Sequence, residues 1–509
     1  MKRYCIFLIL LLGACDLYLD KVPDDRTKIT DAQAVGELLT SAYPDGNYFE
    51  FAYAMSDNAD DRANNGFYAV NNDAYRYQNF TSSAFYPGSP DYYWNACYSA
   101  IAAANEALET IERIGKNDPE FLPYKGEALI CRAYAHFMLC VFWGKSYDPR
   151  TAAVDLGIPY VRETENVVFK EYKRHTVKEV FGYVEKDLEE GIQLLDNTTY
   201  KVPAYHFNTR AASAFASRFY LFRGNTEPGA DGKNDFDRVT GYADKALGNN
   251  PANLLRDING SYVPLTYDEY ELKYNQSSEQ ANLLLSSSYS SFARNVYALQ
   301  RFALSADILR NVILMGVDKS EFEEYPEDVA VFKFKLAGQD QYQHFPKFHT
   351  FFKQEGLNAD VGFDFMVTIL LNAEEALFNK LEGLVMQHRY GEVVDGVRLY
   401  LNKRLNQPCD IDEAYIEKWG KRDRTPLKPA YTQQPDEKQL AFIKYLLHLR
   451  RIEFYYEGIR WMDIKRFHLP VIHKTIDGKV YSLKADDDRK QLPIPESAVA
   501  LGLEKNAGW

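Results

Sequence analysis

RRIEFYYEGIRWMDIKRF, residues 450–467, mixes charged side chains with aromatic and isoleucine neighbours in one short stretch. Glu453 and Glu457 stand four residues apart, so a helix would place both carboxylates on one face, as acid–base catalysis often requires. Arg460 and Asp463 follow at three-residue steps. The same spacing therefore also fits a set of structural ion pairs that holds a helix corner together.

The basic side chains around the two glutamates favour the structural interpretation. They outnumber the glutamates and are Arg450, Arg451, Arg460 and Lys465. An arginine beside a carboxylate favours its ionised form, which suits an ion pair better than a proton donor. We predict a helix that ends near Glu457 and Gly458, a turn, and a second helix from about Ile459 with Trp461 packed inward. The predicted corner pairs four side chains, namely Glu453, Glu457, Arg460 and Asp463.

The N-terminal sequence MKRYCIFLILLLGAC has the pattern of a secretory signal. Two basic residues precede an apolar run, Tyr4–Leu12, which is far shorter than the about 20 residues of a membrane-spanning helix. The run ends in Leu-Gly-Ala-Cys15, which resembles the bacterial lipobox, where a diacylglyceryl group is attached to the cysteine and the chain is cut before it. We predict a signal peptide (1–14) and a lipidated tether (15–30). An ordinary signal peptide with a chance cysteine is the alternative.

Composition narrows the class of protein. With 46% hydrophobic residues among 509, the chain can bury a large interior in one big domain or two closely packed ones. A net charge of −13 without a cluster of Lys and Arg argues against nucleic acid as a partner. The 38 tyrosines and 31 phenylalanines are mostly core, but tyrosine also suits surfaces that bind sugars or peptides.

Apolar positions repeat every three and four residues in several segments, which predicts paired helices. A first helix is expected from about Asp31 to Tyr43. The further helical segments are 91–114, 124–144, 176–195, 210–224, 237–247, 364–381, 393–405 and 437–458. Residues 44–90 and 251–350 lack this period and are expected to be long loop regions, where binding tends to be located. We predict a mostly α fold, an array of about four helical hairpins similar to tetratricopeptide repeats with loop-rich insertions and little β structure, in an N-terminal region (31–250) and a C-terminal region (251–509).

Catalytic and metal-binding motifs are missing from the sequence. There is no HExxH, GxSxG, GxxxxGK or paired CxxC motif. DGKNDFD, residues 231–237, could hold a structural calcium ion through oxygen ligands, but it lacks the EF-hand order of residues, which favours a solvated loop. We expect no cofactor and no enzymatic activity.

Several segments together resemble one family, the SusD/RagB outer-membrane lipoproteins of Bacteroidetes. These segments are the lipobox at Cys15, WNACYSAIAAANEALETI, KGEALICRAYAHFMLCVFWGKS followed by LGIPYV, KRHTVKEVFGYVEKDLEEGIQLL, NAEEAL, residues 450–467, and LPIPESAVALGLEKNAGW. Two features depart from the family pattern: no arginine is evident around residues 363–368, and Ala507 stands where the family often has proline.

The resemblance implies a helical scaffold of four tetratricopeptide-like hairpins on a SusC-like TonB-dependent transporter in the outer membrane, facing the cell exterior and held by lipid at Cys15. Such a protein captures an oligomeric nutrient, usually a glycan, and delivers it to the transporter. The resemblance places ligand contacts in two regions. In the first, the side chains whose chemistry suits sugar binding are Asn58, Asp60, Arg62, Asn64, Phe67, Tyr68, Tyr75 and Arg76. In the second they are Tyr289, Arg294 and Tyr297.

Three other functions stay open at this point. A peptide receptor of the same family is the first, because Trp is scarce, with only five in the chain. A surface glycan hydrolase that uses Glu453 and Glu457 is the second. A protein with a purely structural interaction role is the third.

Overall fold

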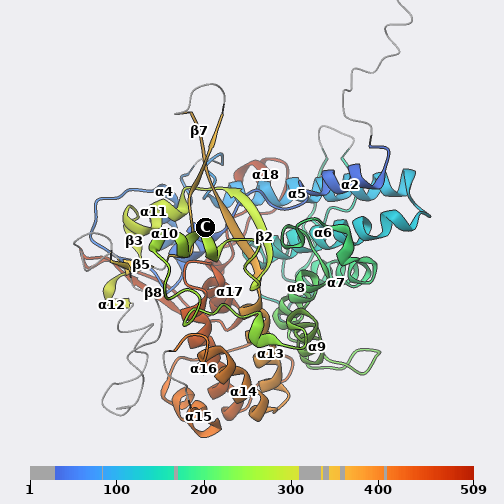
Figure 1. The fold of residues 1–509 in the computed structure, drawn as a ribbon. Coiled ribbons are helices and arrows are strands. Elements are labelled where there is room, and N and C mark those ends of the chain that lie inside the picture. Colours follow the sequence, from blue (N-terminus) through green and yellow to red (C-terminus); the bar gives the residue numbers. More distant parts are fainter. Residues whose placement is uncertain are drawn as a thin grey trace, which may run out of the picture.

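The computed structural model describes residues 29–82, 84–165, 170–308, 346–355, 361–405 and 410–509, together with the backbone of 334–335 and 343–344 (Figure 1). The predicted signal peptide, Cys15 and nearly all of the tether lie outside the described residues and stay predictions. Within the described residues, no helix is long and apolar enough to cross a membrane. The predicted division of the chain at residue 250 also stays a prediction.

Helices dominate the regular structure, as expected. In chain order they are α2 (Ala32–Leu39), α3 (Phe49–Met55), α4 (Ala69–Arg76), α5 (Pro90–Ile114), α6 (Leu122–Trp143), α7 (Val177–Leu194), α8 (Thr209–Arg223), α9 (Asp235–Leu247), α10 (Tyr267–Tyr274), α11 (Phe292–Ala298), α12 (Ala306–Ile308), α13 (Ala373–Met386), α14 (Tyr390–Leu401), α15 (Glu413–Arg422), α16 (Glu437–Glu453), α17 (Ile459–Arg466) and α18 (Glu496–Ala500). Asp31 caps α2 by accepting a hydrogen bond from the backbone N–H of Ala34, as its sequence predicted.

Consecutive helices pack against each other as hairpins and confirm the predicted tetratricopeptide-like scaffold. The hairpins are α5 with α6, α8 with α9, α13 with α14, and α15 with α16, while α6–α7 and α9–α13 contacts join them into an array. Small residues allow close approach: a Cβ on Gly126 of α6 would lie 2.8 Å from the carbonyl oxygen of Gly191 on α7. The array therefore depends on glycine at this crossing.

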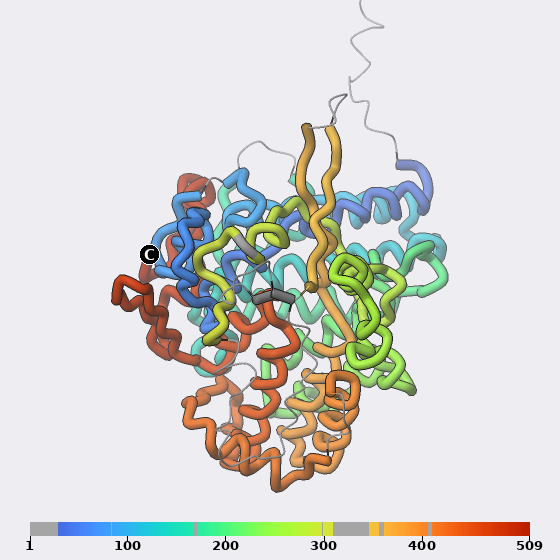
Figure 2. The backbone as a smooth tube through the Cα atoms, turned by 60° about the vertical axis from the view of Figure 1, so that its left-hand side comes forward, coloured from blue at the N-terminus to red at the C-terminus, as the bar shows by residue number. Residues whose placement is uncertain are grey.

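Strands are few and short, apart from one sheet. They are β1 (Asp60–Asp61), β2 (Asn282–Tyr289), β3 (Phe302–Ala303), β4 (Phe334–Lys335), β5 (Gln343–His344), β6 (Phe351–Gln354), β7 (Gly362–Asn372), β8 (Val471–Lys474) and β9 (Val480–Leu483). The order β2-β7-β6 forms an antiparallel sheet. β6 and β7 project from the body of the protein (Figures 1 and 2).

The helix predicted over residues 364–381 is wrong in its first half. Residues 364–372 belong to β7, and α13 begins only at Ala373, where the Asn372 side chain caps it. A short apolar run such as MVTILL fits a buried strand or a buried helix equally well, because its periodicity cannot separate the two. Pairing with β2, 80 residues earlier in the chain, determines the outcome.

The loop region predicted over residues 44–90 contains two helices. All seven residues of α3 are buried, so its sequence FEFAYAM shows no polar face from which a helical period could be read. α4 is also mostly buried, although its residues are largely polar. Burial on every side removes the amphipathic signal on which the prediction relied.

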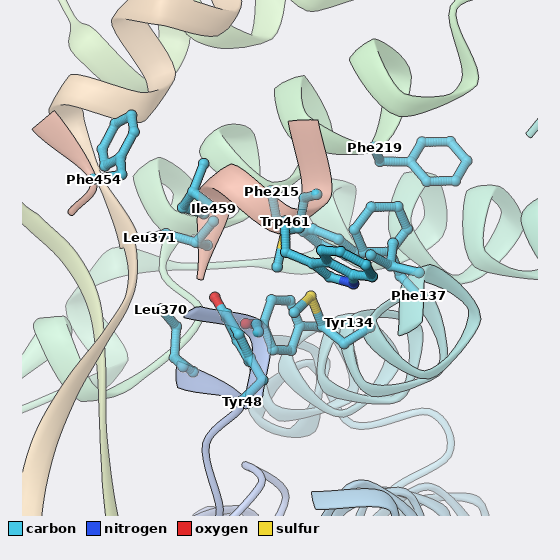
Figure 3. Close-up of a cluster of buried hydrophobic side chains, with 14 of the residues drawn as sticks. Tyr48, Tyr134, Phe137, Phe215, Phe219, Leu370, Leu371, Phe454, Ile459 and Trp461 are labelled. Carbon is cyan, nitrogen blue, oxygen red and sulfur yellow. The ribbon is translucent and has the colours of Figure 1, made fainter. Parts of the chain in front are cut away.

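One large hydrophobic cluster connects the N-terminal helices to the C-terminal ones (Figure 3). Trp461 of α17 is fully buried in it, as predicted. Around it pack Tyr48, Tyr134, Phe137, Phe215, Leu370, Leu371, Phe454 and Ile459. A smaller cluster lies against β2 and β7, with Leu285, Ile369, Tyr262 and Tyr270 as members. Residues of the stretch 450–467 thus contribute to the core that connects the N-terminal and C-terminal helices.

The helix corner occurs close to its predicted place. α16 ends at Glu453, slightly before the predicted Glu457, and α17 begins at Ile459 as expected. Tyr456 and Gly458 have positive φ angles of 68° and 72°, which turn the chain between the helices. A Cβ on Gly458 would also lie 2.7 Å from the Tyr48 ring, so this turn requires glycine for two reasons.

The two glutamates of the corner are buried in ion pairs with other segments rather than with each other. Glu453 accepts two hydrogen bonds of 2.9 Å from the guanidinium of Arg404, and Glu457 accepts one of 2.8 Å from Lys347. Burial alone would raise the pKa of Glu453, but Arg404 more than offsets it and lowers that pKa to about 2. Burial dominates at Glu457 and raises its pKa.

The other two corner residues likewise find partners outside the predicted set. Arg460 donates two hydrogen bonds to Asp57, of 2.8 and 2.7 Å. Asp463 lies between Arg450 and Arg466, each at 3.1 Å in its ion pair. Asp463 therefore joins α17 to α16 within the corner. The ion pairs of Glu453, Glu457 and Arg460 instead tie the corner to distant segments, so the four predicted residues do not pair with one another.

Candidate functional site

The two regions predicted to contact ligand lie side by side although they are far apart in sequence. β1 pairs with β3, so Asp60 is opposite Ala303. The Arg62 guanidinium donates to the carbonyl oxygens of Leu304 and Val296, both at 2.8 Å. The structure therefore brings residues 57–78 and 289–304 together into one surface region.

Four of the predicted ligand residues are buried and occupied by protein partners: Asn58, Arg62, Tyr75 and Tyr297. Asn58 accepts a hydrogen bond from Arg451. The Tyr75 ring is stacked between Phe302 and His473, with centroid distances of 3.9 and 4.0 Å. The Tyr297 hydroxyl donates to the carbonyl oxygen of Phe348. These side chains build the loops, and a ligand at the surface would not reach them without a rearrangement.

The remaining predicted residues are partly or fully exposed. Partly exposed are Asp60, Asn64, Tyr68, Arg76 and Tyr289, and largely exposed are Phe67 and Arg294. Phe67 is 76% exposed, and Arg294 forms an ion pair of 2.7 Å with Asp364 on β7. Their role as ligand contacts stays a prediction.

One face of the projecting sheet carries aromatic side chains that the sequence reasoning did not select. Register places Tyr289 on β2 opposite Phe365 on β7, and Phe365 opposite Phe351 on β6. Phe363, two residues along β7 and 51% exposed, contacts Tyr289 edge to face with a centroid distance of 5.6 Å. Residues directly opposite each other share a face of an antiparallel sheet, so this face offers flat apolar rings to the outside.

A groove of about 660 Å³ lies between α5 and β2. Its lining residues come from five separate segments: Thr40, Ser41, Tyr43, Asp45, Ala84, Phe85, Tyr92, Asn95, Ala96, Ser99, Ala100, Tyr205, His206, Leu285, Ser286 and Ser287. Phe85 belongs to this lining and is 89% exposed. The lining thus combines an aromatic ring with several hydroxyl groups, and it contains neither lysine nor arginine.

Asp45 connects this groove to the aromatic face of the sheet. The Tyr92 hydroxyl donates to its carboxylate at 3.2 Å, and the backbone N–H of Tyr289 donates to it as well. Partial burial raises the pKa of Asp45, against these hydrogen bonds and the nearby Lys353 ammonium. Asp45 thus links α5, which lines the groove, to the end of β2 that carries Tyr289.

A histidine–carboxylate pair lies at the groove and was missed from the sequence: His206 belongs to the lining and contacts Glu127. His206 Nδ1 lies 2.8 Å from Oε1 of Glu127, a fully buried side chain of α6. The Tyr43 hydroxyl donates to the same oxygen at 2.6 Å. No sequence signal marks this contact, because Glu127 and His206 are 79 residues apart and sit in unrelated patterns.

Another hollow, of about 700 Å³, lies between α5, residues 159–172 and the α18 region. It shares Asn95 and Ser99 with the groove, since the exposed side of α5 separates the two. We place the candidate site in the groove, because Phe85 and the aromatic face of the sheet border the groove and not this hollow.

The acidic segment 231–237, considered for calcium, directs two of its carboxylates to arginines. Asp231 pairs with Arg238 and Asp235 with Arg223, each at 2.8 Å. In the described part of the chain, no group of three or more His, Cys, Asp or Glu side chains is arranged to hold a metal ion.

Comparison with known proteins places this architecture in a class. Residues 17–221 match the SusD-like family described as "Starch-binding associating with outer membrane". A SusD superfamily protein from Bacteroides thetaiotaomicron superimposes over 94% of this chain and 100% of its own, with 19% identity and a TM-score of 0.63. A SusD-like carbohydrate binding protein from Bacteroides vulgatus superimposes over 93% of this chain and 96% of its own, with 14% identity and a TM-score of 0.63. A SusD superfamily protein from Parabacteroides distasonis superimposes over 95% of this chain and 100% of its own, with 15% identity and a TM-score of 0.60. No match was found among curated proteins.

The scaffold of helical hairpins therefore has the fold of the SusD-type proteins. Residues 17–221 are in addition similar in sequence to the SusD-like family.

Proposed function

We propose that this protein is a binding protein of the cell surface, which captures an oligosaccharide or polysaccharide and delivers it to a SusC-like TonB-dependent transporter. The observation that carries the proposal is the groove between α5 and β2, where exposed aromatic rings border a lining rich in hydroxyl groups. The description of the matching family as starch-binding and outer-membrane associated supports it.

The chemistry of a sugar fits both the aromatic rings and the hydroxyl groups of this surface. A sugar ring presents apolar C–H faces that can lie on the rings of Phe85, Phe363 and Tyr289. Its hydroxyl groups can exchange hydrogen bonds with the serine, threonine and asparagine side chains of the groove. Binding sites for small molecules are typically lined by apolar and aromatic side chains with a small number of polar groups.

Attachment and location complete the proposal. Lipid on Cys15 would hold the protein at the outer membrane, since acylation anchors a protein while its body stays in water. The tether would leave the groove facing the cell exterior. Copurification of the transporter with the full-length lipoprotein tests this part, and a Cys15→Ala variant that still fractionates with the outer membrane would contradict the anchor.

The other functions considered have distinct signatures. A glycan hydrolase that uses Glu453 and Glu457 is disfavoured, because both side chains are buried in ion pairs and neither lines the groove between α5 and β2. A peptide ligand has one feature in its favour, the outer edge of β6, whose backbone could pair with an extended chain. A peptide would bind with or without Phe85, whereas a sugar in the groove depends on it.

The experiment is affinity measurement on a panel of polysaccharides and on a matched peptide library, with the soluble protein from residue 16 onward. We expect at least one polysaccharide to bind, with affinity that falls severalfold in Phe85→Ala and is unchanged in Val154→Ala, an exposed apolar residue that does not line the groove. Binding of peptides but of no polysaccharide would overturn the proposal.

A further inference from the structure

We propose that His206 is the hydrogen-bonding anchor of the groove and that the groove selects an uncharged sugar over one that bears carboxylate or sulfate. This inference rests on the proposed function, glycan capture in the same groove, and specifies the class of sugar.

The His206 ring is held by two contacts, with the Glu127 carboxylate and with the Tyr200 ring. Its Nδ1 contacts the buried Glu127 carboxylate at 2.8 Å. That carboxylate is held by the Tyr43 hydroxyl, which in turn accepts a hydrogen bond of 2.7 Å from the backbone N–H of Phe207. The ring also stacks on Tyr200 with a centroid distance of 4.4 Å and an angle of 12°. A side chain held this firmly loses little conformational entropy when it binds a ligand.

The second nitrogen of His206 is left for a ligand. The His206 side chain is 20% exposed and lines the groove, and its Nε2 has no partner among the described residues. When Nδ1 donates to Glu127, the neutral ring presents a lone pair at Nε2, which accepts from an O–H group; the protonated ring would donate to a hydroxyl oxygen instead. A sugar hydroxyl satisfies either form.

The charges around the groove disfavour an acidic sugar. Asp45 lines it and Glu127 lies directly behind His206, so an anion would meet two carboxylates. No lysine or arginine lines the groove; Lys353 is close enough to Asp45 to affect its pKa but is not part of the lining. The remaining polar side chains of the lining, besides His206, are uncharged, namely Thr40, Ser41, Tyr43, Tyr92, Asn95, Ser99, Tyr205, Ser286 and Ser287. Neutral hydroxyl groups match this set, since each can both donate and accept.

Two variants test the anchor. In His206→Asn the amide nitrogen takes the place of Nδ1 and keeps the donor to Glu127, while the groove-facing nitrogen is lost. We expect the affinity for a bound polysaccharide to fall about tenfold, the effect of one lost hydrogen bond. The control is His388→Asn, at an exposed turn with φ of 58° that asparagine tolerates, where affinity should not change. Affinity of His206→Asn within twofold of the wild type would overturn the role of His206.

The wild-type protein tests the selection for neutral sugars without any variant. Each polysaccharide that binds is compared with the same material oxidised at its primary hydroxyl groups to carboxylates. We expect weaker binding of the oxidised form, and a smaller difference at high salt because salt screens the repulsion. Equal or tighter binding of the oxidised form would overturn the selection. If the wild type binds no polysaccharide at all, the proposed function itself fails; if it binds and these differences are absent, only the inference fails.

Discussion

Replacing Asp463 by asparagine should destabilise the protein more than any change to an exposed ion pair. Asp463 is the carboxylate partner of Arg450, and both side chains are 1% exposed. Asp463→Asn leaves the Arg450 guanidinium buried without a counter-ion, which costs about 3–5 kcal/mol. Arg466 is less affected, because Glu382 still pairs with it.

The melting temperature (Tm) measures the loss of stability in Asp463→Asn directly. For 509 residues, the unfolding entropy is about 1 kcal/mol/K, so this cost lowers Tm by about 3–5 °C in scanning calorimetry at pH 7. The matched control is Asp477→Asn, whose pair with Lys479 is mostly exposed and which should shift Tm by less than about 1 °C. Glycan affinity should be unchanged in both, since neither residue lines the groove.

The pH dependence gives a second check on the same network. Burial works to raise the pKa of Asp463, but Arg450 and Arg466 more than offset it and hold that pKa below its usual value. The stabilisation by the ionised Asp463 is therefore complete at neutral pH and is lost as the pH falls through its folded-state pKa. The Tm values of the wild type and of Asp463→Asn should therefore converge in acid. A Tm for Asp463→Asn within 1 °C of the wild type at pH 7 would refute the reasoning.

Three further changes have distinct expected results. Glu457→Gln should lower Tm by less than Asp463→Asn, because burial already raises the pKa of Glu457 and so favours its neutral form; calorimetry at pH 7 checks the order, and a larger loss would contradict it. Burial raises the pKa of Glu50 to about 8, so its contribution to stability is complete below pH 4.5 and is lost as the pH rises through about 8. Tm of the wild type should therefore fall between pH 6 and 9, and an equally steep fall in Glu50→Gln would exclude Glu50 as the cause. Phe85→Ala and Phe363→Ala should each weaken glycan binding severalfold in calorimetric titration without a change in Tm, and unchanged affinity in both would remove the aromatic rings from the site.

The helical scaffold was predictable because its signals are local. Apolar spacing identified α5, α6, α7 and α16, and Asp31 marked the start of α2. β7 escaped prediction because a buried apolar run carries no period and only its pairing with β2 distinguishes strand from helix. α3 escaped because it is buried on every side.

The groove itself was not predicted, because none of the residues expected to contact ligand is among its lining residues. Residue types indicated that 57–78 and 289–297 contain binding chemistry, and the structure brings these regions together. Which side chains face outward depends on tertiary contacts: Tyr75 looks like a sugar-stacking residue in sequence, yet it is stacked between Phe302 and His473. Likewise, only the fold brings His206 against Glu127.

The central claim is that the groove between α5 and β2 holds a glycan. The most direct measurement is an experimental structure of the soluble protein with the polysaccharide fragment that binds most tightly on the panel. We expect sugar rings in this groove, in contact with the Phe85 ring and with a hydroxyl at hydrogen-bond distance from His206 Nε2. Sugar bound elsewhere on the protein, with the groove between α5 and β2 empty, would contradict it.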